Sequence, residues 1–366
     1  MSSGTSRRRA GFTLIELLMV IFLIGILATI LGFAANRALI AARQTRILAD
    51  INQLNTAVES FKSERGAYPP TFGKFIGETP TQKQQRIQRF VAKAFPRYTA
   101  NYGAMRAQIS LSTKGLVTAA NAVTPGTIAL TASSTGSSAA DGGLDIENLD
   151  PAETLVFWLG GIPNPTAENK LAGFRADATS PFLDPQNQII NPADPNTLTG
   201  RTPPTFPFQP SRLVDRDRDG WWEYLHAGAK EADQPPPLVY FDNLVYELGP
   251  CYPQTGPSGF TASPDQLALA TFALTWGAVY PYANEGVPTG KPVLSWQKSQ
   301  NFQIISCGLD GLLNPDVAPT NMTTSTSPAA PYFSKVEYFP SGLNFVEQDY
   351  DNLTNFYERR LGDAFQ

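Results

Sequence analysis

A single carboxylate interrupts the longest apolar stretch of the sequence. Residues 12–33 are apolar or small apart from Thr13, Glu16 and Thr29, and Glu16 is the one charged side chain among them. About 20 apolar residues are enough for a helix to cross a bilayer. A charge at the bilayer centre costs about 2.5–3.5 kcal/mol, and less near an interface. Glu16 therefore predicts a positively charged partner.

That partner is absent from the apolar stretch itself, which contains no Lys or Arg. A free α-amino group at Phe12 would supply the charge if the chain were cut after Gly11. The amine of one copy would then neutralise Glu16 of a neighbouring copy in apolar surroundings. The predicted chemistry is thus an ion pair between subunits.

Catalytic and zinc chemistry lack the residues they need. The chain contains two cysteines, Cys251 and Cys307, and one histidine, His226, which are too few soft ligands for zinc. A disulfide between the two cysteines and two unpaired buried thiols both remain open. We find no Gly-x-Ser-x-Gly, P-loop or His-Glu-x-x-His motif. We therefore predict that the protein is not an enzyme, and a membrane-tethered enzyme is the weakest hypothesis.

An acidic loop around residue 217 could hold calcium. Its carboxylates alternate, as at the start of an EF-hand-type loop: Asp215, Asp217 and Asp219. Gly220 permits the sharp bend, Glu223 stands at the ninth position, and His226 stands where a bidentate Glu is expected. Calcium is a predicted ligand here. Ion pairs with the two interleaved arginines are the alternative.

The N-terminus resembles that of type IV prepilins. A basic leader with Arg7, Arg8 and Arg9 precedes the matching run Gly11-Phe12-Thr-Leu-Ile-Glu16. The resemblance implies cleavage between Gly11 and Phe12 by a prepilin peptidase, and N-methylation of Phe12 by the same enzyme. It also implies that Glu16, the fifth residue of the mature chain, guides subunit registration during assembly.

Two further segments resemble major pseudopilins of type II secretion systems. The first is the end of the long helix, where Gly66 is followed by Tyr68-Pro69. The second is the run 306–311, Ser-Cys-Gly-Leu-Asp-Gly, which is similar to the calcium loop of those proteins. The second resemblance implies that Asp310 and the Cys307 carbonyl bind calcium. Two oxygen-bearing residues follow as further candidate ligands: Asn314 and Asp316. A glycine-stabilised turn capped by an aspartate is the alternative.

The resemblance implies a structural subunit of a pseudopilus that acts in protein export. The implied partners are prepilin peptidase, copies of the chain, minor subunits and an inner-membrane secretion platform. The body would be periplasmic, on a single-pass anchor in the bacterial inner membrane whose N-terminus is cytoplasmic before processing. The alternative function is a minor pilin whose body binds DNA, a surface or cargo. The net charge of −4 disfavours nucleic acid as a partner.

One long helix must position the N-terminal residues. We predict it over residues 12–65, with Gly66 and Pro69-Pro70 ending it. Apolar residues recur every three or four positions in its second half: Ile47, Ile51, Leu54, Val58 and Phe61. The chain thus divides into four segments: a cleaved leader (1–11), a transmembrane half-helix (12–33), an amphipathic half-helix (34–66) and an extracytoplasmic body (67–366).

The predicted fold class is α+β, with the long helix packed on a small antiparallel sheet that carries large loop insertions. Shorter helices are predicted over residues 82–95 and 151–159, the latter capped by Asp150. Strands are predicted over residues 238–241, 302–306 and 335–339. Residues 112–143 are rich in Ser, Thr, Ala and Gly, which predicts either a flexible loop or short strands.

Overall fold

The computed structural model describes the elements that carry the predicted sites. The described residues are 13–72, 79–112, 144–163, 171, 173–183, 201–215, 221–229, 235–244, 279, 281–284, 295–314 and 336–365. They belong to two compact units, Met1–Thr45 and Arg46–Gln366.

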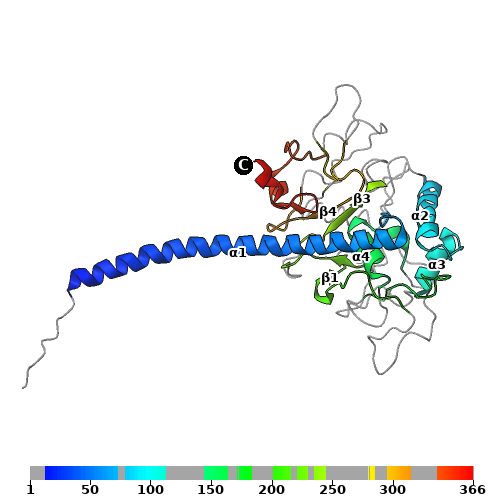
Figure 1. Ribbon diagram of the computed structural model, residues 1–366, viewed down its shortest axis with the longest axis horizontal. Coiled ribbons are helices and arrows are strands. Elements are labelled where there is room, and N and C mark those ends of the chain that lie inside the picture. The colour runs from blue at the N-terminus through cyan, green and yellow to red at the C-terminus, as the bar shows by residue number, and fades with distance from the viewer. Residues whose placement is uncertain are drawn as a thin grey trace, which may run out of the picture. The chain divides into compact units, whose positions relative to one another are not determined.

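Helices and short antiparallel strands make up the described regular structure (Figure 1). The α-helices are α1 (Leu14–Arg65), α2 (Pro80–Ala94), α3 (Tyr102–Ser112) and α4 (Pro151–Gly160). The strands are β1 (Leu213–Val214), β2 (Glu223–Tyr224), β3 (Val239–Asp242), β4 (Phe302–Ser306) and β5 (Leu353–Thr354). Short 3₁₀ helices are η1 (Ile146–Asn148), η2 (Pro210–Arg212), η6 (Glu347–Asp351) and η7 (Leu361–Phe365). The predicted α+β class is confirmed.

The first unit contains the apolar part of α1. Nearly all its described side chains are exposed from residue 13 to residue 45. Among the residues that the structure describes, α1 is the one helix long and apolar enough to cross a membrane. Its apolar side chains lie on every side of the helix, which is the pattern of a segment surrounded by lipid or by other apolar helices.

The second part of α1 belongs to the body. Its predicted apolar stripe is confirmed, because all five side chains are buried: Ile47, Ile51, Leu54, Val58 and Phe61. They share one core with residues of the sheet, among them Tyr240, Phe302 and Ile304. The helix ends as predicted at Arg65, and Gly66 follows at φ +80° with its N–H bonded to the Lys62 carbonyl (2.7 Å).

The segment after α1 is fixed to the rest of the body by its backbone. The Tyr240 hydroxyl donates to the Pro69 carbonyl (2.9 Å), and the Trp158 indole N–H donates to the Pro70 carbonyl (3.0 Å). The buried Asp242 carboxylate accepts from the Thr71 hydroxyl (2.8 Å). Three contacts in succession therefore join the end of α1 to β3 and α4.

The sheets are small and antiparallel. In the three-stranded sheet β4 is central, between β3 and β5, and Ile305 lies opposite both Val239 and Thr354. The strands β1 and β2 pair separately, with Val214 opposite Glu223. All five side chains of β4 are buried, so this strand is covered on both faces by the rest of the body.

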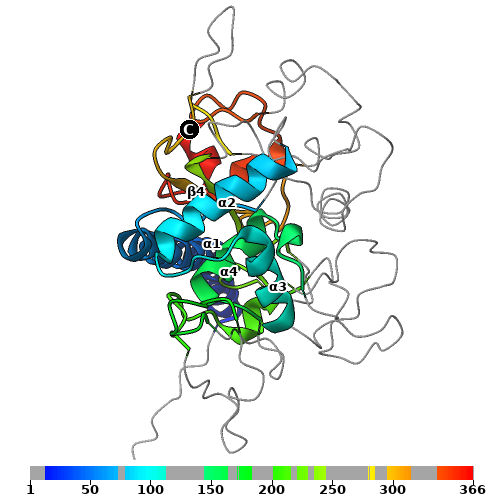
Figure 2. The ribbon, with the colours of Figure 1, turned by 90° about the vertical axis from the view of Figure 1, so that its right-hand side faces the viewer.

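The shorter helices begin with complete capping boxes. The Thr79 side chain and Gln82 cap α2, and Asp150 and Glu153 cap α4. Every residue of α4 is buried, and Trp158 lies among Phe61, Phe72 and Phe90. The helices α2 and α3 contact each other, and Figure 2 shows both on the face toward the viewer.

Several sequence predictions need adjustment. The helix predicted at 82–95 is α2, which starts two residues earlier because Thr79 caps it. The strand predicted at 335–339 is wrong for its described part, where Tyr338 forms isolated bridges and a tight turn returns the chain to Leu343. Helix α3 was not predicted, although Asn101 caps its start by accepting from the Ala104 N–H (2.9 Å) and its residues Tyr102, Met105 and Ile109 are buried.

Candidate functional site

The start of α1 holds the predicted assembly residue in a local hydrogen-bonded arrangement. Both the Thr13 N–H (2.8 Å) and the Thr13 hydroxyl (2.7 Å) donate to Oε2 of Glu16. The Glu16 N–H points back to the Thr13 hydroxyl (3.3 Å). This is a reciprocal cap in which Thr13 satisfies the first turn of the helix and Glu16 satisfies Thr13. The sequence interpretation gave Thr13 no such role.

This arrangement leaves part of the Glu16 carboxylate open. Both donors go to Oε2, and within the described residues no donor reaches Oε1. Glu16 is exposed at the first turn, where the helix dipole also favours a negative charge. Gly11 and Phe12, the predicted cleavage and methylation residues, lie outside the described residues. The geometry permits Glu16 to accept one further cationic donor.

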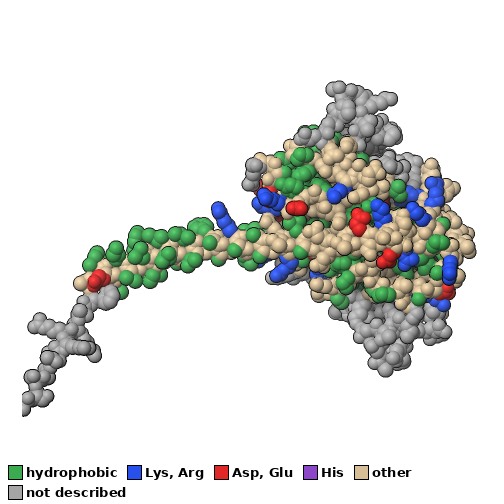
Figure 3. Space-filling view, in the orientation of Figure 1, with side chains coloured by type: hydrophobic (Ala, Val, Ile, Leu, Met, Phe, Trp, Pro, Cys, Tyr) green, Lys and Arg blue, Asp and Glu red, His purple; other side chains and the backbone are tan. Residues whose placement is uncertain are grey.

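Large apolar side chains precede and follow Glu16 along the helix, and they are exposed. They form a continuous apolar surface around the helix (Figure 3). The exposed ones are Leu14, Ile15, Leu17, Leu18, Met19, Val20, Ile21, Phe22, Leu23, Ile24, Ile26, Leu27, Ile30, Leu31, Phe33, Leu39 and Ile40. An apolar surface of this size requires a lipid or protein environment to cover it.

The loop with the predicted calcium ligand Asp310 packs on η6. Its backbone N–H groups at Leu309 and Asp310 both donate to Oδ2 of Asp351. The Asp310 side chain accepts from the Leu312 N–H (2.9 Å). Burial, and then the nearby charges of Asp351 and Glu347, raise the pKa of Asp310 to about 6. Asp351 was not among the predicted site residues, because it is distant from Asp310 along the chain.

Asn314 belongs to a separate buried network. Its side-chain nitrogen donates to Glu337 Oε1 (2.6 Å) and Asp349 Oδ2 (2.9 Å). Burial raises the pKa of both carboxyl groups, and the nearby charge of Asp349 raises the pKa of Glu337 further. Asn352 donates to Tyr282 (2.9 Å) beside them. Asn314 thus bridges two acids through its N–H₂ group, whereas a calcium ligand would use its oxygen.

The other predicted calcium loop connects β1 to β2. Asp215 follows β1 directly, and Glu223 opens β2 as a fully buried residue opposite Val214. Asp217, Asp219 and Asp316 lie outside the described residues. Among the side chains that the structure does describe, no three His, Cys, Asp or Glu residues are grouped so as to hold a metal ion. Calcium binding at either loop stays a prediction.

A disulfide between Cys251 and Cys307 stays one of two alternatives, beside two unpaired buried thiols. Cys307 is a buried free thiol, 3.8 Å from the Pro236 carbonyl, and burial raises its pKa. Cys251 lies outside the described residues. His226 is buried, and its ring nitrogen lies 3.2 Å from the Ala227 carbonyl. Burial lowers the pKa of His226, in keeping with a packed neutral histidine.

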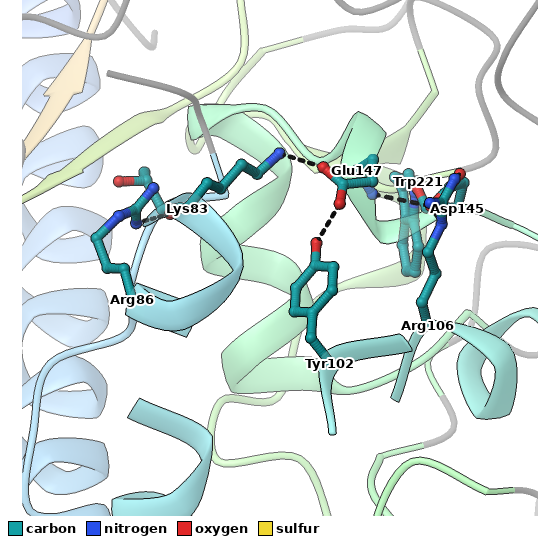
Figure 4. A network of polar contacts seen from close by, with 8 residues as sticks. Lys83, Arg86, Tyr102, Arg106, Asp145, Glu147 and Trp221 are labelled. Atoms are coloured by element: carbon teal, nitrogen blue, oxygen red, sulfur yellow. Dashed lines mark hydrogen bonds and ion pairs between the residues drawn. The ribbon is translucent and has the colours of Figure 1, made fainter. Parts of the chain in front are cut away.

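A polar network joins α2, α3 and η1 (Figure 4). Glu147 accepts from Lys83 (2.6 Å) and from the Tyr102 hydroxyl (2.7 Å). Arg106 forms a bidentate pair with Asp145. Burial acts to raise the pKa of Glu147, but the Lys83 charge and its hydrogen bonds outweigh burial, so the pKa is lowered. The network joins three elements and contains no nucleophile or free base.

Comparison with known proteins identifies the N-terminal segment. Residues 6–32 match the family model described as "Prokaryotic N-terminal methylation motif". No curated protein and no solved structure matches the chain. The match includes Gly11, Phe12 and Glu16, and it confirms the coarse part of the prediction. Residues 6–32 therefore carry an N-terminal methylation motif, which is consistent with a type IV pilin-like protein.

Proposed function

We propose that this protein is a structural subunit of a type IV pilin-like filament, of the pseudopilus kind that serves protein export. One observation carries the proposal. A lone acid, Glu16, opens an exposed apolar helix inside the segment that matches the methylation motif. Such an acid is unfavourable in apolar surroundings unless it meets a positive charge.

Processing would create that charge. Cleavage after Gly11 leaves a free amine at Phe12, and methylation keeps its positive charge. The open Oε1 atom of Glu16 can accept this amine from a neighbouring subunit while Thr13 still holds Oε2. One ion pair for each subunit then fixes the axial step, and burial of the apolar side chains against neighbouring helices provides cohesion.

The finer assignment to a type II secretion system rests on two local resemblances. These are the helix end at Gly66 and Tyr68-Pro69 and the 306–311 loop. The body would then stand in the periplasm, the anchor in the bacterial inner membrane, and the assembly platform of the secretion system would be the partner. Bound calcium would make the body more rigid before assembly.

The test is co-expression of the full chain with a prepilin peptidase, followed by mass measurement of its N-terminus and collection of sheared filaments. The proposal expects a mature chain that begins with methylated Phe12 and assembles. Glu16→Gln should be processed but should assemble poorly. Glu64→Gln is the matched control, because Glu64 is an exposed carboxylate on the same helix. An uncut parent chain, or full assembly of Glu16→Gln, would overturn the proposal.

A further inference from the structure

The segment that contains α2 and α3 is strongly basic in a chain that is negative overall. Residues 79–112 contain no Asp or Glu, whereas the whole chain has a formal net charge of −4. Its cations are Lys83, Arg86, Arg89, Lys93, Arg97 and Arg106. Such a local excess of one sign creates a positive potential over this part of the surface.

Half of these cations form ion pairs or hydrogen bonds with other residues of the body. Lys83 bonds to Glu147 and Arg106 to Asp145, while Arg86 donates to the Thr71 carbonyl (2.7 Å) (Figure 4). The remaining three, Arg89, Lys93 and Arg97, are exposed. Within the described residues they form no ion pair, so their charges act outward.

Arg65 at the end of α1 extends this surface. Its guanidinium lies 4.5 Å from the centre of the Phe95 ring and donates to the Ala94 carbonyl (3.4 Å). Lys93 lies against Gly66, where a Cβ atom would be 3.0 Å from Lys93 Cε. The basic face is defined as Arg65, Arg89, Lys93 and Arg97. Figure 3 shows Lys and Arg side chains gathered at the end of the body where α2 lies.

An acidic face lies elsewhere on the same body. It is defined as Asp310, Glu347 and Asp351. Glu347 and Asp310 are exposed, the Asp310 N–H donates to Oδ2 of Asp351 (3.0 Å), and Glu347 and Asp351 both belong to η6, so the three carboxylates lie on one part of the surface. Arg360 approaches Asp351 (3.6 Å) but also bonds to Asp363 (2.9 Å), so one arginine is shared between two acids. The net charge of this face is negative when no calcium ion is bound at Asp310, so this face can bind either calcium or a basic partner.

The two faces lie at different ends of the body. Helix α2 is at one end along the direction of the second part of α1, and the C-terminal segment with η6 and η7 is toward the other (Figure 1). Two complementary surfaces on different sides of a subunit make a heterologous contact. Contacts of this kind generate open helical filaments when the rotation does not close a ring. Basic face against basic face would instead be repulsive.

We infer that the basic face of one subunit contacts the acidic face of the next copy in the filament. The inference rests on the proposed function and adds a second, directional contact to the Glu16 pair. Exposed ion pairs contribute little one at a time. Their effect here is on register and polarity, because reversed or slipped neighbours would bring like charges together.

The first experiment reverses the basic face in the full chain, co-expressed with prepilin peptidase. The variant carries Arg89→Glu, Lys93→Glu and Arg97→Glu, and sheared filaments are measured beside the N-terminal mass. We expect normal processing at Phe12 and a filament yield lower by about tenfold or more. Lys298→Glu is the control for the Lys-to-Glu exchange within this variant, because Lys298 is also exposed but lies outside the basic face.

The second experiment tests the pairing itself. Glu347→Lys should reduce the filament yield alone and should restore part of it in the chain with the reversed basic face. The Glu347 side chain makes no hydrogen bond or ion pair within the described residues, so its exchange leaves the fold intact. A parent-like filament yield from the reversed basic face would overturn the inference while the proposed function stands.

Two further outcomes would also overturn the proposed contact. Loss of filaments without any rescue by Glu347→Lys would overturn this contact and assign the basic face to another anionic partner. A parent chain that is processed but forms no filament would overturn the proposed function, and the contact with it. The N-terminal mass and the parent filament yield, measured in the same samples, keep the two failures distinguishable.

Discussion

Asp50 and Arg212 form a buried ion pair that joins the second part of α1 to the body. The Arg212 guanidinium donates to both oxygens of the Asp50 carboxylate, and both residues are under 10% exposed. Arg212 also lies over the Tyr224 ring (4.1 Å) and donates to the Leu225 carbonyl. Each of the three guanidinium nitrogens thus has a hydrogen-bond partner, as a buried charge requires.

Removing one partner of this pair should destabilise the body strongly. Asp50→Ala would leave the Arg212 charge buried without its counterion, at a cost of about 3–5 kcal/mol in the free energy of unfolding. Denaturant unfolding of the purified protein in detergent measures the change. The double variant Asp50→Ala/Arg212→Met is the control and should lose less than Asp50→Ala alone. Equal losses of unfolding free energy in the two variants would contradict this explanation, because the destabilisation would then come from loss of the ion pair and not from an unpaired buried charge.

The Asp50 pair also shows what sequence patterns can and cannot predict. The stripe from Ile47 to Phe61 predicts the buried side of α1 correctly, because helical periodicity is local. Asp50 lies three residues after Ile47 and four before Leu54, so it falls within that stripe. Nothing local in the sequence indicates its partner Arg212, which is 162 residues away.

The candidate sites also divide into those that local sequence predicts and those that depend on tertiary folding. Gly11, Phe12 and Glu16 are adjacent in the sequence, and their chemistry follows from an acid in an apolar run. The Thr13 cap could have been predicted from the Thr-x-x-Glu spacing. The contact between Asp351 and the Asp310 loop could not, because tertiary folding brings these residues together.

A close approach of two backbones makes Gly161 irreplaceable. Its φ is +86°, and an added Cβ would lie 2.3 Å from the Gly173 backbone. Gly161→Ala should therefore combine the strain of a backbone region that is essentially confined to glycine (φ +86°, ψ −158°), about 1–3 kcal/mol, with an overpacking cost of about 1–3 kcal/mol. Gly228→Ala isolates the strain, because Gly228 has φ +90° and nothing within 4 Å of its Cβ position. Comparable melting temperatures for the two variants would contradict the predicted clash.

Buried acids should make the body less stable as pH rises. Burial raises the pKa of Asp150 to about 6 and raises the pKa of Glu337 and Asp349 above their usual values. The folded state therefore binds more protons than the unfolded state, and this stabilisation is present below about pH 4 and lost through pH 6 and above. Denaturant unfolding between pH 4 and pH 8 measures the slope.

Two substitutions test the source of that slope. Glu337→Gln keeps the shape of the side chain and removes one titrating group, so the loss of stability with rising pH should become shallower. Glu147→Gln should act in the opposite sense, because the pKa of Glu147 is lowered and its contribution is lost as pH falls. An unchanged slope in Glu337→Gln would rule out this acid as the source.

Calcium should raise the melting temperature of the body if either acidic loop binds it. A ligand that binds only the folded state stabilises it by about 2.7 kcal/mol at one hundred times its dissociation constant. Asp310→Ala should abolish the rise if the 306–311 loop is the site, and Asp219→Ala should abolish it if the 215–223 loop is. Magnesium is the matched control ion, because it demands tighter octahedral geometry than a flexible loop provides. A melting temperature that does not respond to calcium in the parent protein would eliminate both loops as calcium sites, and the acidic face of Asp310, Glu347 and Asp351 would then keep its negative charge for a cationic partner.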